Sequence, residues 1–126
     1  MNSNHSLSNI SRHSGCSVSG ALSVSAFVKD AVSIVHGPSG CAHQASSLFH
    51  STMIAHERFD IPYIHTSGLR ENEIIFGGED KLRDSIKDAL SLSPSAVFVI
   101  GTCISGTIGD DIDSVCGEEW GIPVIN

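Results

Sequence analysis

The stretch from Ala31 to Cys41, AVSIVHGPSGC, constrains the fold of this chain more than any other. Its first residues are small or β-branched and mostly apolar, and a Gly and Pro turn bounds them. This pattern favours a buried strand over Ala31–Val35. Cys41 then stands where the next helix should begin. In a parallel α/β sheet, loops leaving the carboxyl ends of strands face the ligand crevice, and a helix N-terminus there favours anions and thiolates.

A second stretch repeats this arrangement. The apolar run Ala96–Ile100 predicts another buried strand, and Gly101, Thr102 and Cys103 follow at its exit. Because the carboxyl ends of parallel strands meet at one edge of a sheet, we expect Cys41 and Cys103 to open onto the same crevice.

The remaining segments alternate between helix and strand patterns. This alternation predicts an α/β fold, a Rossmann-like parallel sheet with flanking helices. We expect helices over Ser19–Val28, Ala42–Ala55, Glu79–Leu92 and Gly109–Glu119, an edge strand over Ile61–His65 and a last strand at Val124 and Ile125. The third helix is the clearest, because its apolar residues share one face. Pro62 places its strand at the sheet edge, since proline donates no ladder hydrogen bond.

Length and composition bound the domain organisation. A chain of 126 residues with 40% apolar content forms one domain with a modest core. Residues 1–14 are rich in Ser, Asn and His and predict a flexible polar arm, so the domain spans 15–126. Because the sequence stops within a predicted strand, we expect an incomplete domain.

Charge and hydropathy exclude several classes of partner. The chain has 14 acidic and 7 basic residues, a formal net charge of -7, and its basic residues are scattered. This pattern argues against nucleic acid and anionic lipid as partners. No apolar run approaches the length that spans a bilayer, and the N-terminus lacks the apolar core of a secretory signal. We therefore expect a soluble, cytoplasmic chain.

The cysteines are the main candidates for metal-ligating residues. Cys16, Cys41 and Cys103 lie far apart in sequence, each beside a glycine or small residue and each expected outside a regular element. Such positions suit an iron-sulfur cluster, whose irons are held by thiolates, usually four, and tuned by backbone N–H groups of glycine-rich turns. For any one of these cysteines alone, a small buried hydrophobe is the better explanation. Cys116 falls within a predicted helix, and we expect it to be a packed thiol. Without a sign of export, reduced thiols are favoured over disulfides.

Other polar residues have simpler explanations. His36 precedes the turn and His43 follows Cys41. Either could line the crevice, with His43 the better candidate, although a histidine beside a turn is more often hydrogen-bonded structure. Gly77 and Gly78 are not accompanied by the GK(S/T) or GxGxxG motif of a phosphate-binding loop, so we expect them to form a turn. Asp110 and Asp111 are expected to cap a helix.

Several motifs together resemble the nitrogenase component 1 family over most of residues 15–125. They are GC at 15–16, HGPSGC at 36–41, IIFGGEDKL at 74–82, TC at 102–103 and IGDDIDSVC at 108–116. Within the family, VFVIGTC, IGDDIDSVC and the closing GIPVI most resemble the branch of cofactor-assembly scaffolds.

The resemblance implies a cluster site and partners. Cys16, Cys41 and Cys103 match the family's three cluster-ligating cysteines, which hold a P-cluster or a four-iron cluster between two homologous subunits. Family subunits have three Rossmann-like domains, so this chain would cover part of the first. Electrons would arrive from an ATP-dependent iron protein. The α subunits of nitrogenase carry an arginine soon after the second cysteine; here Phe49 and His50 stand in that region, which weakens a dinitrogen-reducing function.

Three functions therefore remain open. The first is an electron-relay segment of a nitrogenase-like oxidoreductase, with no catalytic acid, base or nucleophile in this chain. The second is a scaffold for assembly of the iron-molybdenum cofactor. The third is a truncated, cluster-free interaction module.

Overall fold

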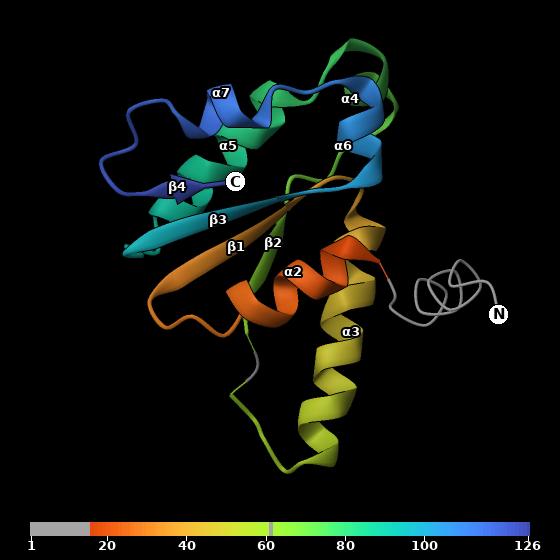
Figure 1. Cartoon of the computed structure of the whole chain (residues 1–126), viewed down its shortest axis with the longest axis vertical. Helices are drawn as coiled ribbons and strands as arrows, with labels where there is room; N and C mark the ends of the chain where they lie inside the picture. Colours follow the sequence, from red (N-terminus) through yellow and green to blue (C-terminus); the bar gives the residue numbers. More distant parts are fainter. Residues whose placement is uncertain (1–15, 61) are drawn as a thin grey trace, which may run out of the picture.

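The computed structural model describes residues 16–60 and 62–126, so the predicted arm over residues 1–14 lies outside the described part. Its centre is a parallel sheet of four strands in the order β2-β1-β3-β4 (Figure 1). The strands are β1 (Ala31–His36), β2 (Ile64–Thr66), β3 (Ala96–Gly101) and β4 (Val124–Ile125). The predicted Rossmann-like α/β class is confirmed.

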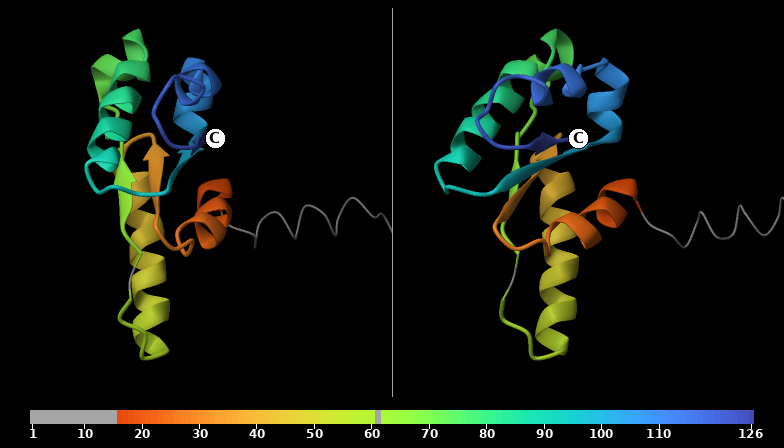
Figure 2. Two further views of the ribbon diagram at one scale, coloured as in Figure 1. Left: turned by 90° about the vertical axis from the view of Figure 1, so that its left-hand side faces the viewer. Right: turned by 60° about the vertical axis from the view of Figure 1, so that its left-hand side comes forward.

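Six helices surround this sheet in the described residues. They are α2 (Ser17–Ser25), α3 (Ser39–Ala55), α4 (Glu71–Phe76), α5 (Glu79–Leu90), α6 (Cys103–Ile108) and α7 (Ile112–Cys116). Helices α2 and α3 cover one face of the sheet, and α5 and α7 cover the other, as Figures 1 and 2 show. The domain thus has three layers, and no described helix is long and apolar enough to cross a lipid bilayer.

The larger core lies between the sheet and α5. Val32 and Ile34 of β1 and Val97 of β3 point to this face, where they meet Leu82 and Ile86. Alternate residues of a strand face opposite sides, so every second residue of β1 joins this cluster. The apolar stripe of α5, predicted from its periodicity, is the surface that packs here.

The second core lies between the sheet and helices α2 and α3. Val35 of β1 points to this face and packs with Leu22 of α2 and with Ala42 and Ala45 of α3. The small alanines let α3 approach the sheet closely. This face therefore holds the start of α3 firmly against the carboxyl end of β1.

The strand order defines the crevice. Residues of β1 and β3 pair in register along their whole length, from Ala31 opposite Ala96 to His36 opposite Gly101. The chain runs outward to β2 on one side of this pair and to β4 on the other. The junction of β1 and β3 is thus the switch point of a doubly wound sheet, where ligands bind in such folds.

Several predicted boundaries are wrong. The helix expected over Ser19–Val28 is α2 (Ser17–Ser25), and the helix expected over Glu79–Leu92 ends at Leu90. The expected helix over Gly109–Glu119 is only α7, because Gly109 adopts a left-handed φ of 75° that ends α6. The edge strand is confirmed as an edge, but begins at Ile64; Ile61, its predicted first residue, is not described. The turn at 77–78 is confirmed, with Gly77 at a φ of 99° after α4.

Candidate functional site

The loops that leave β1 and β3 lie directly against each other. Thr102 Oγ1 donates a hydrogen bond to the carbonyl oxygen of His36 at 3.1 Å. A Cβ atom on Gly37 would stand 2.5 Å from both Oγ1 and Cγ2 of Thr102, so the residue there must be glycine. This close approach brings together the two loops that lead to Cys41 and Cys103.

Each of the three predicted cysteines stands at or near a helix start. Cys16 is the N-cap residue of α2 and is exposed. Cys41 is the third residue of α3 and is half-buried, and Cys103 opens α6 and is exposed. The expectation that all three lie outside regular elements is therefore wrong for Cys41 and Cys103. The cause is that α3 begins directly after Pro38, whose fixed φ suits a helix start, and that Thr102 caps α6.

The Cys41 thiol is influenced electrostatically by the other two cysteines. Burial raises the pKa of the Cys41 thiol, and negative charge on Cys103 and Cys16 raises it further. Charges interact in this way only over short distances in a solvated site. The crevice therefore brings together groups that are far apart in the sequence.

The described residues contain no preformed site for a single metal ion. Among residues 16–60 and 62–126, no group of three His, Cys, Asp or Glu side chains is arranged to hold one metal ion. A lone Zn²⁺ needs its sulfur ligands at about 2.3 Å. A cluster presents a different iron to each thiolate, so its ligands need not converge on one point.

A buried polar network lies behind the two cysteine loops. His36 is 0% exposed and Ser67 is 6% exposed. His36 Nε2 lies 2.7 Å from Asp110 Oδ2, and Nδ1 lies 2.9 Å from Ser67 Oγ. Ser67 Oγ also accepts a hydrogen bond from Gly37 N at 3.1 Å, while Gly78 N donates to Asp110 Oδ1 at 2.9 Å. The expectation that a histidine beside this turn is hydrogen-bonded structure is confirmed for His36.

Ser67, His36 and Asp110 have the composition of a hydrolase triad but not its accessibility. The serine oxygen of a nucleophile must face space that a substrate can enter. Ser67 Oγ is instead buried and occupied by the N–H of Gly37. The network is therefore structural.

The two aspartates have different roles. Asp111 accepts a hydrogen bond from Ser114 N at 3.0 Å and caps α7, which confirms the capping prediction for this residue. For Asp110 the prediction is wrong, because its carboxylate faces inward to His36 and Gly78. The sequence carries no local signal for this pair, since His36 and Asp110 are 74 positions apart.

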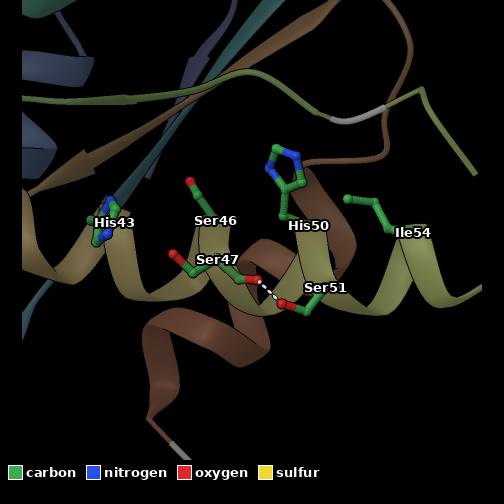
Figure 3. Close-up of a pocket in the computed structure, with 6 residues that line it drawn as sticks. All are labelled: His43, Ser46, Ser47, His50, Ser51 and Ile54. Carbon is green, nitrogen blue, oxygen red and sulfur yellow. Dashed lines mark hydrogen bonds between the residues drawn. The ribbon is translucent and has the colours of Figure 1, made fainter.

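His43 and Cys116 lie away from the network. His43 is exposed and lines a shallow hollow of about 340 Å³ along α3, in which Figure 3 shows Ser51 Oγ bonded to the Ser47 carbonyl oxygen at 3.0 Å. Cys116 is buried in the α5 core, and burial with the nearby Asp113 raises its thiol pKa to about 11. The prediction of a packed thiol at Cys116 is confirmed.

Fold and site together define a doubly wound α/β domain that presents cysteines at its switch point. The chain belongs to the nitrogenase component 1 type oxidoreductase family, whose family model matches residues 16–125. The family resemblance predicted from the motifs is thereby confirmed.

Individual relatives include both scaffolds and nitrogenase subunits. The nitrogenase iron-molybdenum cofactor biosynthesis protein NifE of Nostoc sp. is 39% identical, over 88% of this chain and 24% of the relative. The nitrogenase molybdenum-iron protein alpha chain of Methanothermobacter marburgensis is 34% identical, over 82% of this chain and 25% of the relative. A solved structure titled "Nitrogenase Cp1 at pH 5" superposes with a TM-score of 0.72 at 34% identity, covering 88% of this chain and 24% of that chain. The chain thus spans about a quarter of the length of these relatives.

Proposed function

We propose that Cys16, Cys41 and Cys103 hold an iron-sulfur cluster, of four-iron or P-cluster type, at an interface with a homologous component 1 subunit. In this proposal the chain is the electron-relay segment of a cytoplasmic nitrogenase-like oxidoreductase and receives electrons from an ATP-dependent iron protein. The observation that carries the proposal is the placement of two cysteines at the switch point. Cys41 lies in the first turn of the helix after β1, and Cys103 opens the helix after β3, whose cap residue Thr102 donates to the His36 carbonyl oxygen at 3.1 Å.

In this proposal the chain's own residues bind the cluster and orient its cysteine ligands. When bound, the cluster supplies one-electron transfer. Each cysteine must lose its proton to become a ligand, and burial raises the pKa of the Cys41 thiol, so deprotonation costs more there. Thr102 caps α6 through Ser105 N at 3.3 Å and so fixes the direction in which Cys103 leaves the sheet. Three thiolates leave a ligand position for the partner subunit to fill.

A second candidate is a scaffold that carries a precursor of the iron-molybdenum cofactor without turnover. The similarity to NifE of Nostoc sp. supports it. Phe49 and His50 support it as well, because they stand where resemblance to nitrogenase α subunits would require an arginine. Both candidates use the same three cysteines.

The experiment that tests cluster binding measures iron and acid-labile sulfide after anaerobic purification, with and without a co-expressed homologous subunit. We expect iron in the paired preparation, with a loss of most of it in Cys16→Ser, Cys41→Ser and Cys103→Ser. The matched control is Cys116→Ala, which removes the buried thiol and should leave the iron content unchanged. A folded, soluble chain without iron in either preparation would overturn both cluster functions and leave the cluster-free interaction module.

Turnover then separates the two candidates. The iron-loaded complex is mixed with an ATP-dependent iron protein, ATP and a reductant, and oxidation of its cluster is followed by electron paramagnetic resonance. ATP-dependent electron transfer with substrate reduction supports the relay, whereas a loaded complex that turns over no substrate but donates cofactor to an apo-nitrogenase supports the scaffold.

A further inference from the structure

His36 holds both ends of α6, the short helix that Cys103 opens. At the N-terminal end, Thr102 Oγ1 donates to the carbonyl oxygen of His36 at 3.1 Å. Just beyond the C-terminal end, Asp110 Oδ2 lies 2.7 Å from Nε2 of the same histidine. Both ends of the helix that begins with Cys103 are thus anchored to His36, the last residue of β1.

The same residue leads into the loop that carries Cys41. His36 ends β1, and the chain passes through Gly37 and Pro38 into α3. Ser67, which follows β2, accepts a hydrogen bond from Gly37 N at 3.1 Å and contacts His36 Nδ1 at 2.9 Å. The loop is therefore fixed from the β2 side and from the α6 side at once.

Every polar atom of this network has a partner. The carboxylate of Asp110 can only accept, so the proton of the ring lies on His36 Nε2. With the ring proton on Nε2, Nδ1 is an acceptor, so the Ser67 hydroxyl donates to Nδ1 while its oxygen accepts from Gly37 N–H. Asp110 also accepts from Gly78 N, where a Cβ atom would stand 2.8 Å from Oδ2 and 3.2 Å from His36 Cε1. A network that is fully satisfied and this tightly packed holds one geometry.

We propose that the His36–Asp110 pair is the positioning device that sets the separation of the Cys41 and Cys103 thiols; this inference rests on the cluster-binding function proposed above. A cluster fixes the distances between its thiolates, so a chain that presets them binds it more tightly. The partners that hold metal ligands in place commonly change metal affinity about 10–100-fold when removed. The pair thus acts through the two helices and touches no substrate.

The first experiment measures the thiol separation in the full chain without iron. Spin labels are placed on Cys41 and Cys103 in a Cys16→Ser, Cys116→Ala background, and the distance distribution is measured by double electron–electron resonance. We expect a narrow distribution that broadens or shifts in Asp110→Asn, because one carboxylate oxygen becomes an N–H₂ group that opposes the donor of either His36 or Gly78. An unchanged distribution in a folded Asp110→Asn chain would overturn the proposal.

The matched control is Asp111→Asn. It removes the same charge one position away and keeps the helix cap, since Asn and Asp cap equally well. We expect its distance distribution to equal that of the parent chain. Equal broadening in Asp110→Asn and Asp111→Asn would show a charge effect and overturn the proposal.

Two substitutions of His36 give a rescue test, which also decides the matter if Asp110→Asn does not fold. In His36→Gln the amide nitrogen can replace Nε2 and still donate to Asp110. In His36→Asn the shorter amide can replace only the contact with Ser67. A merely structural role predicts that both variants lose stability with unchanged thiol separation. The positioning role predicts a narrow distribution in His36→Gln and a broad one in His36→Asn; the same distribution in both variants would contradict it.

Iron retention connects the device to the proposed function. In the anaerobic complex with a homologous subunit, we expect Asp110→Asn to lose iron to a chelator about tenfold faster than Asp111→Asn. Equal loss rates would overturn positioning while leaving cluster binding intact. A parent complex without iron would instead overturn the proposed function, and the spin-label distances would still decide whether the pair positions the thiols.

Discussion

Substitution of Gly37 by alanine should open the contact between the two cysteine loops. The new Cβ would stand 2.5 Å from Cγ2 and Oγ1 of Thr102 and 3.0 Å from its Cβ, whereas carbon atoms pack best at about 3.5–4.0 Å. Thr102 must therefore turn away or move with α6. Either change breaks its hydrogen bonds to the His36 carbonyl oxygen and to Ser105 N.

The expected cost follows from these two losses. Overpacking of a tight contact costs about 1–3 kcal/mol. Loss of a helix cap costs about 0.5–2 kcal/mol. We therefore expect Gly37→Ala to lower the free energy of unfolding by about 1.5–5 kcal/mol, and to lower iron retention, because Cys103 follows Thr102 directly.

Gly40→Ala is the matched control. It lies in α3 with no atom within 4 Å of the added Cβ, so alanine should stabilise the helix by about 0.5–1 kcal/mol. Both substitutions reduce the entropy of the unfolded chain equally, so this contribution cancels between them. Urea unfolding followed by circular dichroism gives the two free energies. If Gly37→Ala is as stable as Gly40→Ala, the close approach of the loops described above is wrong.

Three further predictions concern the thiols and the core. At pH 8, iodoacetamide should alkylate exposed Cys103 early and Cys116 last, because a thiol of pKa about 11 is only about one-thousandth ionised; early mass labelling of Cys116 would contradict its burial. Folding raises the pKa of Cys116 from 9.0 to about 11, so on raising the pH the unfolded chain loses this proton before the folded chain does. The free energy of unfolding should therefore fall between about pH 9 and pH 11. Urea unfolding should show this decline, and Cys116→Ala should flatten it. Ile86→Ala, at 0% exposure in α5, should cost about 2–5 kcal/mol, whereas Ile75→Ala, at 71% exposure in α4, should cost little; similar costs in thermal or urea unfolding would refute the packing of α5.

The elements with strong local patterns could be predicted from the sequence. Strands β1 and β3 are short apolar runs bounded by turn residues, and α5 carries one apolar stripe, so burial on the sheet dictates each of them. In each of these cases one local rule agrees with the tertiary packing. The edge position of β2 is also as predicted, but Pro62 lies before the strand that forms at Ile64–Thr66, so its missing donor is not the cause.

The missed features depend on contacts or on caps. Helix α6 was not predicted because its sequence, CISGTI, has weak helix propensity, although the cap formed by Thr102 and Ser105 was a usable signal. The early start of α3 was likewise signalled by Pro38. The pairing of His36 with Asp110 had no such signal, because it exists only once the sheet has brought the exit of β1 beside the end of α6.

The central claim is that Cys16, Cys41 and Cys103 ligate an iron-sulfur cluster. Iron-edge X-ray absorption of the anaerobic complex tests it most directly, because it reports the atoms bound to iron rather than the amount of iron. The account predicts a shell of sulfur ligands together with iron–iron scattering, both lost in Cys41→Ser and kept in Cys116→Ala. A shell of oxygen and nitrogen ligands without iron–iron scattering, unchanged by Cys41→Ser, would contradict it.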